Sequence, residues 1–245
     1  MKKKLIIIIP VFVVVIVAAL FVTFKSLGSS NILTKNANKT TASTSSGYRL
    51  DLRIYGTYNN KRINKIVSAS NYKNQDKTIT VSNLTNGKIF ESVLKGDNST
   101  AEDVDSYVIK GNKYYKVENG ELKDVKDVAY KNPDIYLDGI KKMKNIKQES
   151  NQTIADTVYK VYSGTVSKSV INDIASNADE KFEFDKDCNV EVWLTQDDYV
   201  YKVYYKVDQM TFYASYFAIG KTGKINLDEY KKEAVWTSQV KVDNL

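Results

Sequence analysis

The fold is decided by residues 190–217, VEVWLTQDDYVYKVYYKVDQMTFYASYF. Apolar and polar residues alternate at its start, the period of a strand that is half-buried on one face. Val190, Val192 and Leu194 fall on one face, and Glu191 and Trp193 fall on the other. Two short polar turns divide the stretch into three such segments. It therefore predicts three consecutive antiparallel strands.

The second and third of these strands differ in how much cover they need. In Val200–Val207, four residues share one face opposite two lysines: Tyr201, Val203, Tyr205 and Val207. Met210–Ile219 is apolar on both faces. Met210, Phe212, Ala214 and Tyr216 share one face, and Phe217 and Ile219 lie on the other. A strand that is apolar on both faces must be covered on both. We expect helices on one face and an internal layer or a cavity on the other.

Earlier segments repeat the strand pattern. Arg49–Tyr55 alternates strictly, with Leu50, Leu52 and Ile54 on one face. Asn-Gly and similar turn pairs join further runs, which is typical of an antiparallel meander and not of a βαβ series. The other predicted strands are Ile63–Ser70, Thr78–Ser82, Ile89–Leu94, Ser106–Lys110, Tyr114–Glu118, Thr157–Ser163 and Ile225–Leu227.

Two segments change to helical spacing, Asp134–Ile146 and Ser167–Ser176. Gly139 weakens the first prediction, because a glycine inside a helix costs about 1 kcal/mol relative to alanine. Ser167 is a suitable N-cap for the second. The fold class is thus α+β: a large curled antiparallel sheet of about 10–12 strands, a half-barrel with one or two helices packed on it. An N-terminal transmembrane helix precedes it, and the curled sheet is expected to leave a concave apolar interior.

An apolar run at the N-terminus predicts a membrane anchor. Leu5–Phe24 is long enough to cross a bilayer as a helix, and Lys2–Lys4 favour a cytoplasmic N-terminus. Cleavage after Gly28, as in a signal peptide, is the alternative. The predicted organisation is a basic cytoplasmic stub (1–4), a transmembrane anchor (5–24), a flexible tether (25–47), a β-rich extracytoplasmic domain (48–230) and a polar C-terminal tail (231–245). We expect a single-pass protein of the cell membrane in a bacterium, a Gram-positive one.

Composition excludes several function classes. The net charge is +7, yet six lysines of the first 39 residues account for all but +1 of it, so residues 48–245 carry no basic surface of the kind that binds nucleic acid. Histidine is absent, which removes the commonest metal ligand and general base. Cys188 is the single cysteine, so an internal disulfide and a two-cysteine metal site are excluded. We expect no enzyme, no metal and no cofactor.

The order of elements resembles the LolA/LppX-type half-barrel of bacterial envelope carriers. The similarity rests on a strand ending at residues 162–166, the helix Ser167–Ser176, Val190-Glu191-Val192-Trp193-Leu194, and two strands at 199–207 and 212–219. In the first half it is architectural, with strands leading to a helix that starts at Pro133-Asp134. The resemblance implies a half-barrel over residues 48–230 whose concave face holds acylated or lipidic ligands. No site residue of that family can be transferred to this chain.

The sequence therefore predicts a membrane-tethered extracytoplasmic module that binds a lipid, an acyl chain or a lipidated partner in a concave apolar sheet face. The alternative is a cell-envelope interaction or sensory ectodomain that binds a protein or a wall polymer and no small ligand. The expected lining is apolar: Leu50, Leu52, Ile54, Val81, Phe90, Ile109, Trp193, Phe212 and Tyr216.

Overall fold

The computed structural model describes residues 32–72, 76–84, 101–119, 121–178 and 180–223. The predicted anchor, the predicted strands Ile89–Leu94 and Ile225–Leu227, and the C-terminal tail lie outside these ranges. No helix in the described part of the chain is both long and apolar enough to cross a membrane.

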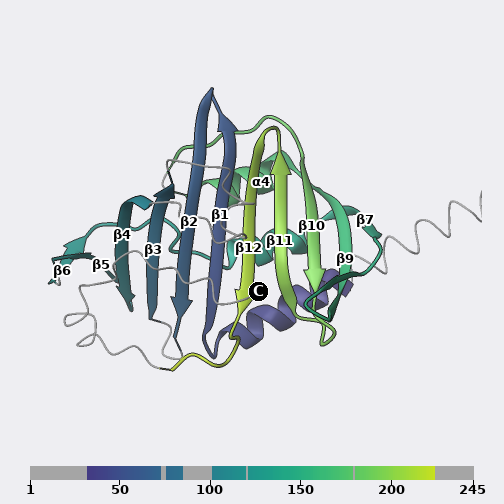
Figure 1. Ribbon diagram of the computed structural model, residues 1–245, viewed down its shortest axis with the longest axis horizontal. Coiled ribbons are helices and arrows are strands. Elements are labelled where there is room, and N and C mark those ends of the chain that lie inside the picture. Colours follow the sequence, from purple (N-terminus) through teal and green to yellow (C-terminus); the bar gives the residue numbers. More distant parts are fainter. Residues whose placement is uncertain (1–31, 73–75, 85–100, 120, 179, 224–245) are drawn as a thin grey trace, which may run out of the picture.

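Strands dominate the described chain and confirm the predicted antiparallel sheet. Together they form one 12-stranded sheet (Figure 1). The strands are β1 (Tyr48–Tyr58), β2 (Lys61–Asn71), β3 (Lys77–Leu84), β4 (Ala101–Lys110), β5 (Lys113–Glu118), β6 (Glu121–Val125), β7 (Lys144–Gln148), β8 (Gln152–Ile154), β9 (Thr157–Val166), β10 (Cys188–Leu194), β11 (Val200–Val207) and β12 (Met210–Phe217).

The sheet is built from two halves that meet at its centre. Its order is β6-β5-β4-β3-β2-β1-β12-β11-β10-β9-β7, with β8 paired to β9 alone. β1 pairs with β12 in antiparallel register, so that Leu52 lies opposite Ala214. The chain thus runs from the centre to one edge, crosses behind the sheet, and returns from the other edge to the centre (Figure 1).

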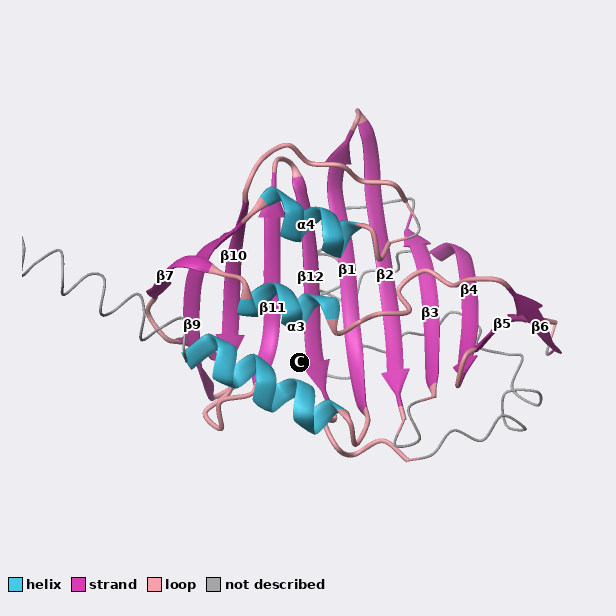
Figure 2. Cartoon of the chain, turned by 180° about the vertical axis from the view of Figure 1, so that it is seen from behind, coloured by secondary structure: helices cyan, strands magenta, loops and turns pink. Residues whose placement is uncertain are grey.

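Helices cover one face of the sheet, as Figure 2 shows. α3 (Ile135–Lys141) and α4 (Lys168–Ala175) lie across the central strands, and a third helix covers residues 32–44 along the ends of the strands. This helix begins near β9 and runs toward β1 in both views (Figures 1 and 2). The α+β class is therefore confirmed, with one helix more than the sequence predicts.

Residues 32–44 were expected to be part of a flexible tether, and this prediction is wrong for them. Leu33 and Ala37 are fully buried and belong to the hydrophobic core. Thr40 is also fully buried, and its Oγ1 accepts a hydrogen bond of 2.9 Å from the backbone N–H of Val200. A buried backbone donor that is left without a partner is costly, so this contact ties the helix to the start of β11.

The first predicted helix is shorter than its pattern. α3 ends at Lys141, and Ile146 lies in β7, where it is 6% exposed. Asn145, between them, has a left-handed φ of 54°, which interrupts helical geometry. The apolar spacing of Ile146 therefore reflects packing in the sheet and not a continued helix.

The second predicted helix is confirmed as α4, with a different cap from the one expected. Ser167 takes the N-cap position, but its side chain makes no capping hydrogen bond. The carboxylate of Asp187 instead accepts a hydrogen bond of 3.1 Å from the N–H of Lys168. An anion at this end also complements the helix dipole.

Candidate functional site

The helix-covered face of the sheet is the candidate site, because it gathers most of the predicted lining. Seven of the nine predicted residues are buried in one core with at most 6% exposure: Leu50, Leu52, Ile54, Val81, Ile109, Phe212 and Tyr216. Phe90 lies outside the described residues. Trp193 follows the inward-facing Val192 in β10, so it lies on the opposite face of the sheet.

Aromatic rings fill the space between the sheet and the segment that leads from α4 to β10. Phe182 and Phe184 pack edge-to-face on Phe212, with ring centroids 5.6 and 5.9 Å away. Tyr58 adds edge-to-face contacts to the same two phenylalanines at 5.2 and 5.7 Å. These rings are the protein's own side chains, and they fill the space between this segment and the sheet.

Two tyrosines of the sheet form hydrogen bonds with the segment Pro133–Tyr136, which covers them. The Tyr205 hydroxyl donates to the carbonyl of Tyr136 at 2.6 Å, and the Tyr216 hydroxyl donates to the carbonyl of Pro133 at 3.2 Å. Burial raises the pKa of both phenols well above the ordinary value, so both remain protonated donors.

A third tyrosine of the sheet binds the same segment. The Tyr48 hydroxyl donates a hydrogen bond of 3.1 Å to the Asp134 carboxylate. Burial and the charge of Asp134 together raise the pKa of Tyr48. Three hydroxyls from three different strands therefore hold the start of α3 over the core.

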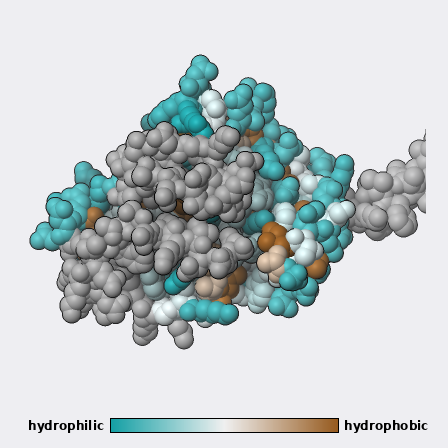
Figure 3. Space-filling model, in the orientation of Figure 1, coloured by the Kyte–Doolittle hydropathy of each residue, from teal (hydrophilic) through white to brown (hydrophobic). Residues whose placement is uncertain are grey.

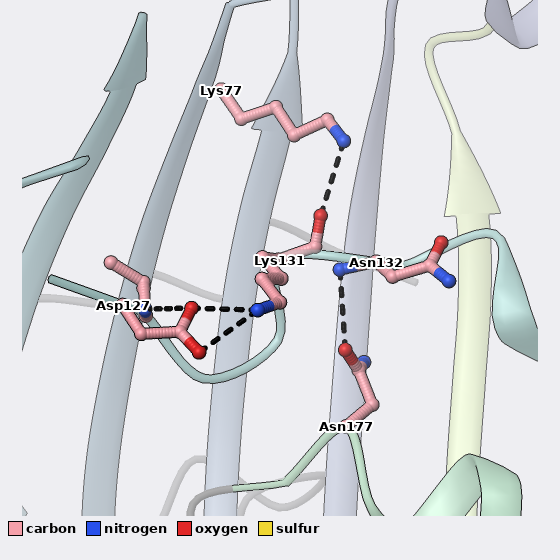
Figure 4. Close-up of polar contacts among 6 residues, drawn as sticks. Lys77, Asp127, Lys131, Asn132 and Asn177 are labelled. Carbon is pink, nitrogen blue, oxygen red and sulfur yellow. Dashed lines mark hydrogen bonds and ion pairs between the residues drawn. The ribbon is translucent and has the colours of Figure 1, made fainter. Parts of the chain in front are cut away.

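The connection from β6 to α3 crosses the first half of the sheet and is held by polar contacts (Figure 4). The ammonium group of Lys77 donates to the carbonyl of Lys131 at 3.1 Å, and the N–H of Asn132 donates to Oδ1 of Asn177 at 3.2 Å. Lys131 itself is paired with Asp127 at 2.7 Å. These contacts lie near the surface, whereas the hydrogen bonds to Pro133 and Asp134, at the end of the same connection, are buried or partly buried.

A narrow crevice lies under this connection. It is too narrow to hold a water molecule, whereas ligand pockets usually measure roughly 300–1,000 Å³. Its lining is partly apolar and partly polar: Tyr48, Ala69, Ser70, Asn71, Lys77, Ile79, Tyr130 and Pro133. At this crevice, the described part of the chain leaves no room for a ligand between the connection and the sheet.

The opposite face of the sheet carries an aromatic cluster that the sequence analysis did not recognise as a group. The rings of Tyr159 and Tyr201 stack at 4.6 Å, and the ring of Trp193 lies 6.0 Å from Tyr159. A register shift between Trp193 and Leu194 places Tyr201 on this face, so its predicted place beside Val203 is wrong. Figure 3 shows small hydrophobic patches on the right-hand side of this face, among mostly hydrophilic residues.

One lysine is enclosed by this cluster. The ammonium group of Lys202 lies 3.6 Å from the centroid of the Trp193 ring, and the Trp193 indole N–H donates to Glu191 at 2.7 Å. Lys202 is only 8% exposed, and burial lowers its pKa to about 8. The rings favour a cation while the loss of solvent disfavours it, so this amine is unusually easy to deprotonate.

Several titratable groups outside this cluster are engaged in local contacts. Asp198 pairs with Lys160 at 2.8 Å, and Asp105 pairs with Lys116 at 2.8 Å. Cys188 is buried, and burial raises the pKa of its thiol to about 12. Within the described ranges, no three His, Cys, Asp or Glu side chains gather as metal ligands would.

An antiparallel sheet with helices over one apolar face is the architecture of the LolA/LppX-like fold, and solved structures match it. LprF from Mycobacterium bovis is 12% identical, with a TM-score of 0.52, over 79% of this chain and 95% of that chain. The lipoprotein LppX from Mycobacterium tuberculosis is 9% identical, with a TM-score of 0.47, over 80% of this chain and 98% of that chain. A LolA superfamily protein from Nitrosomonas europaea covers a similar share, at 8% identity and a TM-score of 0.27.

No protein-family model matches the sequence, and no curated protein does either. The chain therefore has a LolA/LppX-like fold, shown by structural similarity to LprF at low sequence identity. This fold agrees with the predicted resemblance over the β-rich domain.

Proposed function

We propose that the chain is a membrane-tethered extracytoplasmic module that binds a lipid, an acyl chain or a lipidated partner between its sheet and the helical cover. The observation that carries this proposal is the apolar face formed by Leu50, Leu52, Ile54 and Phe212 under short helices. Burial of apolar ligand surface, at about 25 cal/mol per Å², would supply the affinity. No covalent chemistry is involved.

Binding requires the cover to move, because the face is closed. The connection between β6 and α3 is the part that opens in this proposal, since the crevice already lies beneath Tyr130 and Pro133. Its polar contacts from Lys77 and Asn177 are near the surface, and the buried hydrogen bond from Tyr216 to Pro133 must break for it to open. Opening there leaves the sheet intact and exposes the apolar side chains of β1, β2 and β3 to a ligand.

Native mass spectrometry tests this proposal. The sample is the chain from Ser26 onward, which keeps every described residue but lacks the predicted anchor. It is purified from bacterial membrane lysate and, separately, incubated with phospholipids and a lipidated peptide. We expect one lipid per chain, identified after extraction. An apo mass that persists after both incubations would contradict the proposal.

A Tyr216→Phe variant sharpens the test. Loss of its hydrogen bond to Pro133 weakens the closed form by about 1 kcal/mol, so apparent lipid affinity should rise several-fold. Tyr204→Phe is the matched control, because Tyr204 lies on the opposite face and contacts the ring of Tyr213. Equal affinities for both variants would show that opening at Pro133 does not limit binding.

A second function is favoured by one observation. The crevice is too narrow for water and aromatic rings fill the core, which suits an envelope interaction or sensory ectodomain with a protein or wall-polymer partner. The same mass-spectrometric experiment separates the two, because such a domain would carry no lipid.

A further inference from the structure

The helix of residues 32–44 is fixed to the domain and is not a spacer. Its buried side chains include Leu33 and Ala37, and Thr40 accepts the hydrogen bond from Val200. At its exposed side, the ammonium group of Lys39 lies 4.3 Å from the ring centroid of Tyr199. The domain therefore starts, as a rigid body, at the first turn of this helix.

Because the helix is docked, the domain is held closer to the bilayer than a flexible tether would hold it. The predicted anchor ends at Phe24, so only residues 25–31 separate it from the docked helix. Seven extended residues reach at most ~25 Å, less than the width of the sheet. A tether that lasted to residue 47 would have allowed about three times that reach. The start of the helix must therefore stay close to the membrane surface.

The part of the domain next to that start is the edge formed by the ends of β9, β10 and β11 (Figures 1 and 2). Three partly exposed aromatic side chains lie there, on the face away from α3 and α4, and the buried ring of Tyr159 stacks on one of them. We call this group the aromatic edge: Trp193, Tyr199, Tyr201 and Tyr159. Tyrosine and tryptophan are enriched at the membrane–water interface, because their rings are apolar and their tips are polar.

Further side chains at this edge fit the same environment. Ile32, at the first turn of the helix, is 44% exposed and is one of the few large exposed apolar residues. Lys39 has the long apolar stem and terminal charge of an interfacial lysine. Lys160 is paired with Asp198, so these two residues add no net charge to the edge.

We propose that the aromatic edge rests in the phospholipid headgroup layer, held there by the docked helix and the short connection to the anchor. The inference rests on the membrane anchor of the proposed function, not on lipid binding in the core. It fixes the orientation of the domain: the tip of the β1–β2 hairpin, at the far ends of the strands, points away from the bilayer.

Tryptophan fluorescence tests this orientation in the full chain. The sequence has two tryptophans, so Trp236→Phe leaves Trp193 as the sole reporter. The protein is reconstituted into phosphatidylcholine vesicles that contain lipids with a quencher at the headgroup or deep in the acyl chains. We expect headgroup quenchers to remove most of the Trp193 emission and deep quenchers to remove little.

The matched control moves the reporter to the hairpin. Lys61→Trp, combined with replacement of both native tryptophans by phenylalanine, places it near Tyr58, at a side chain that is 71% exposed. We expect its emission to survive both quenchers. Equal quenching of the two reporters would overturn the proposal, because the domain would then have no fixed orientation.

A second variant tests whether the short connection to the anchor sets the orientation, or whether the affinity of the aromatic rings for the bilayer is enough. A Gly-Ser insertion of about 20 residues between residues 31 and 32 adds a mean reach of roughly 25 Å and leaves the docked helix intact. We expect it to restore most of the Trp193 emission. Undiminished quenching would show that the connection does not set the orientation and would overturn that part of the proposal.

Failure of the anchor can be told apart from failure of lipid binding. A full chain that does not float with the vesicles overturns this inference, whereas lipid binding by the chain from Ser26 onward is measured independently of it.

Discussion

The Tyr205 hydroxyl donates a hydrogen bond of 2.6 Å to the carbonyl of Tyr136, across the interface between β11 and α3. The two rings also lie 6.2 Å apart in a tilted arrangement. Both residues are fully buried, so this bond forms where no water can replace it. It is the most enclosed of the three tyrosine contacts that hold α3 over the sheet.

Removing this hydroxyl should destabilise the protein. We expect Tyr205→Phe to lower the free energy of unfolding by about 1 kcal/mol, since a buried hydrogen bond is lost and the ring is kept. Chemical denaturation followed by circular dichroism measures the change. The control is Tyr204→Phe, one residue along the strand on the other face, which should leave stability nearly unchanged. An equal loss in both variants would contradict this account of the contact.

The docked helix provides a second prediction. Thr40→Val keeps the shape of the side chain but removes the acceptor for the Val200 N–H, and we expect a loss of about 1–3 kcal/mol in unfolding free energy. Thr41→Val is the control, because Thr41 Oγ1 donates only to Ala37 within its own helix. If residues 32–44 were a tether, both variants would unfold at the same denaturant concentration as the parent chain.

The pKa of Lys202, lowered to about 8, predicts how stability depends on pH. An exposed lysine titrates near 10.4, so between about pH 8 and pH 10 the unfolded chain holds a proton that the folded chain has released. The contribution of Lys202 to unfolding free energy therefore rises with pH through this window and is least favourable below it.

A comparison with Lys202→Met isolates this effect from other titrating groups. We expect the stability of the parent chain relative to the variant to increase from about pH 8 to pH 10 and to stay flat at lower pH. Denaturation curves of both proteins across this range provide the measurement. A difference that is constant with pH would mean that the Trp193 ring compensates for the lost solvation of the ammonium group.

Cys188 should be inert in the folded protein. Burial raises the pKa of its thiol to about 12, which reduces the reactive thiolate about a thousandfold relative to a thiol near 9. We expect a maleimide or disulfide reagent to label the native chain only as fast as it unfolds, and the denatured chain at once. Rapid stoichiometric labelling of native protein would place Cys188 at an accessible position instead.

Strand positions were predictable because burial on one face of a sheet leaves a period of two in the sequence. Leu50, Leu52 and Ile54 show this directly, and the structure buries all three. The β1–β12 pairing was not predictable, because it joins strands at opposite ends of the domain and no local pattern encodes it.

The failures have local physical causes. Helix 32–44 escaped notice because its buried face includes Asn36, Thr40 and Thr44, which look like linker residues in a sequence. In the helix, the two threonine hydroxyls form hydrogen bonds with backbone groups. Gly139 weakened the prediction of α3, yet a Cβ there would come within 2.9 Å of the Tyr205 ring carbon that bears its hydroxyl. Glycine allows the helix to approach the sheet.

The sequence predicts which side chains share the helix-covered face of the sheet, but it does not predict whether that face binds a ligand. Alternation identifies which side chains share one side of a sheet, and it assigns Trp193 to the side opposite Val192. It does not tell a ligand lining from a filled core, because both are apolar with the same period. The aromatic edge required the register shift near Leu194, which no sequence pattern marks.

The central pairing of β1 with β12 also determines when the protein can fold. The strand pairing of Leu52 with Ala214 and the hydrogen bond between Thr40 and Val200 each join residues more than a hundred positions apart. Neither can form until the later residue has been synthesised. Such non-local contacts carry a large loop-closure entropy and are typical of slow folding. In the described part of the chain, the first strand is thus completed by the last. Until β12 is available, the central edge of β1 has no partner strand, and an unpaired edge of this kind is prone to aggregation.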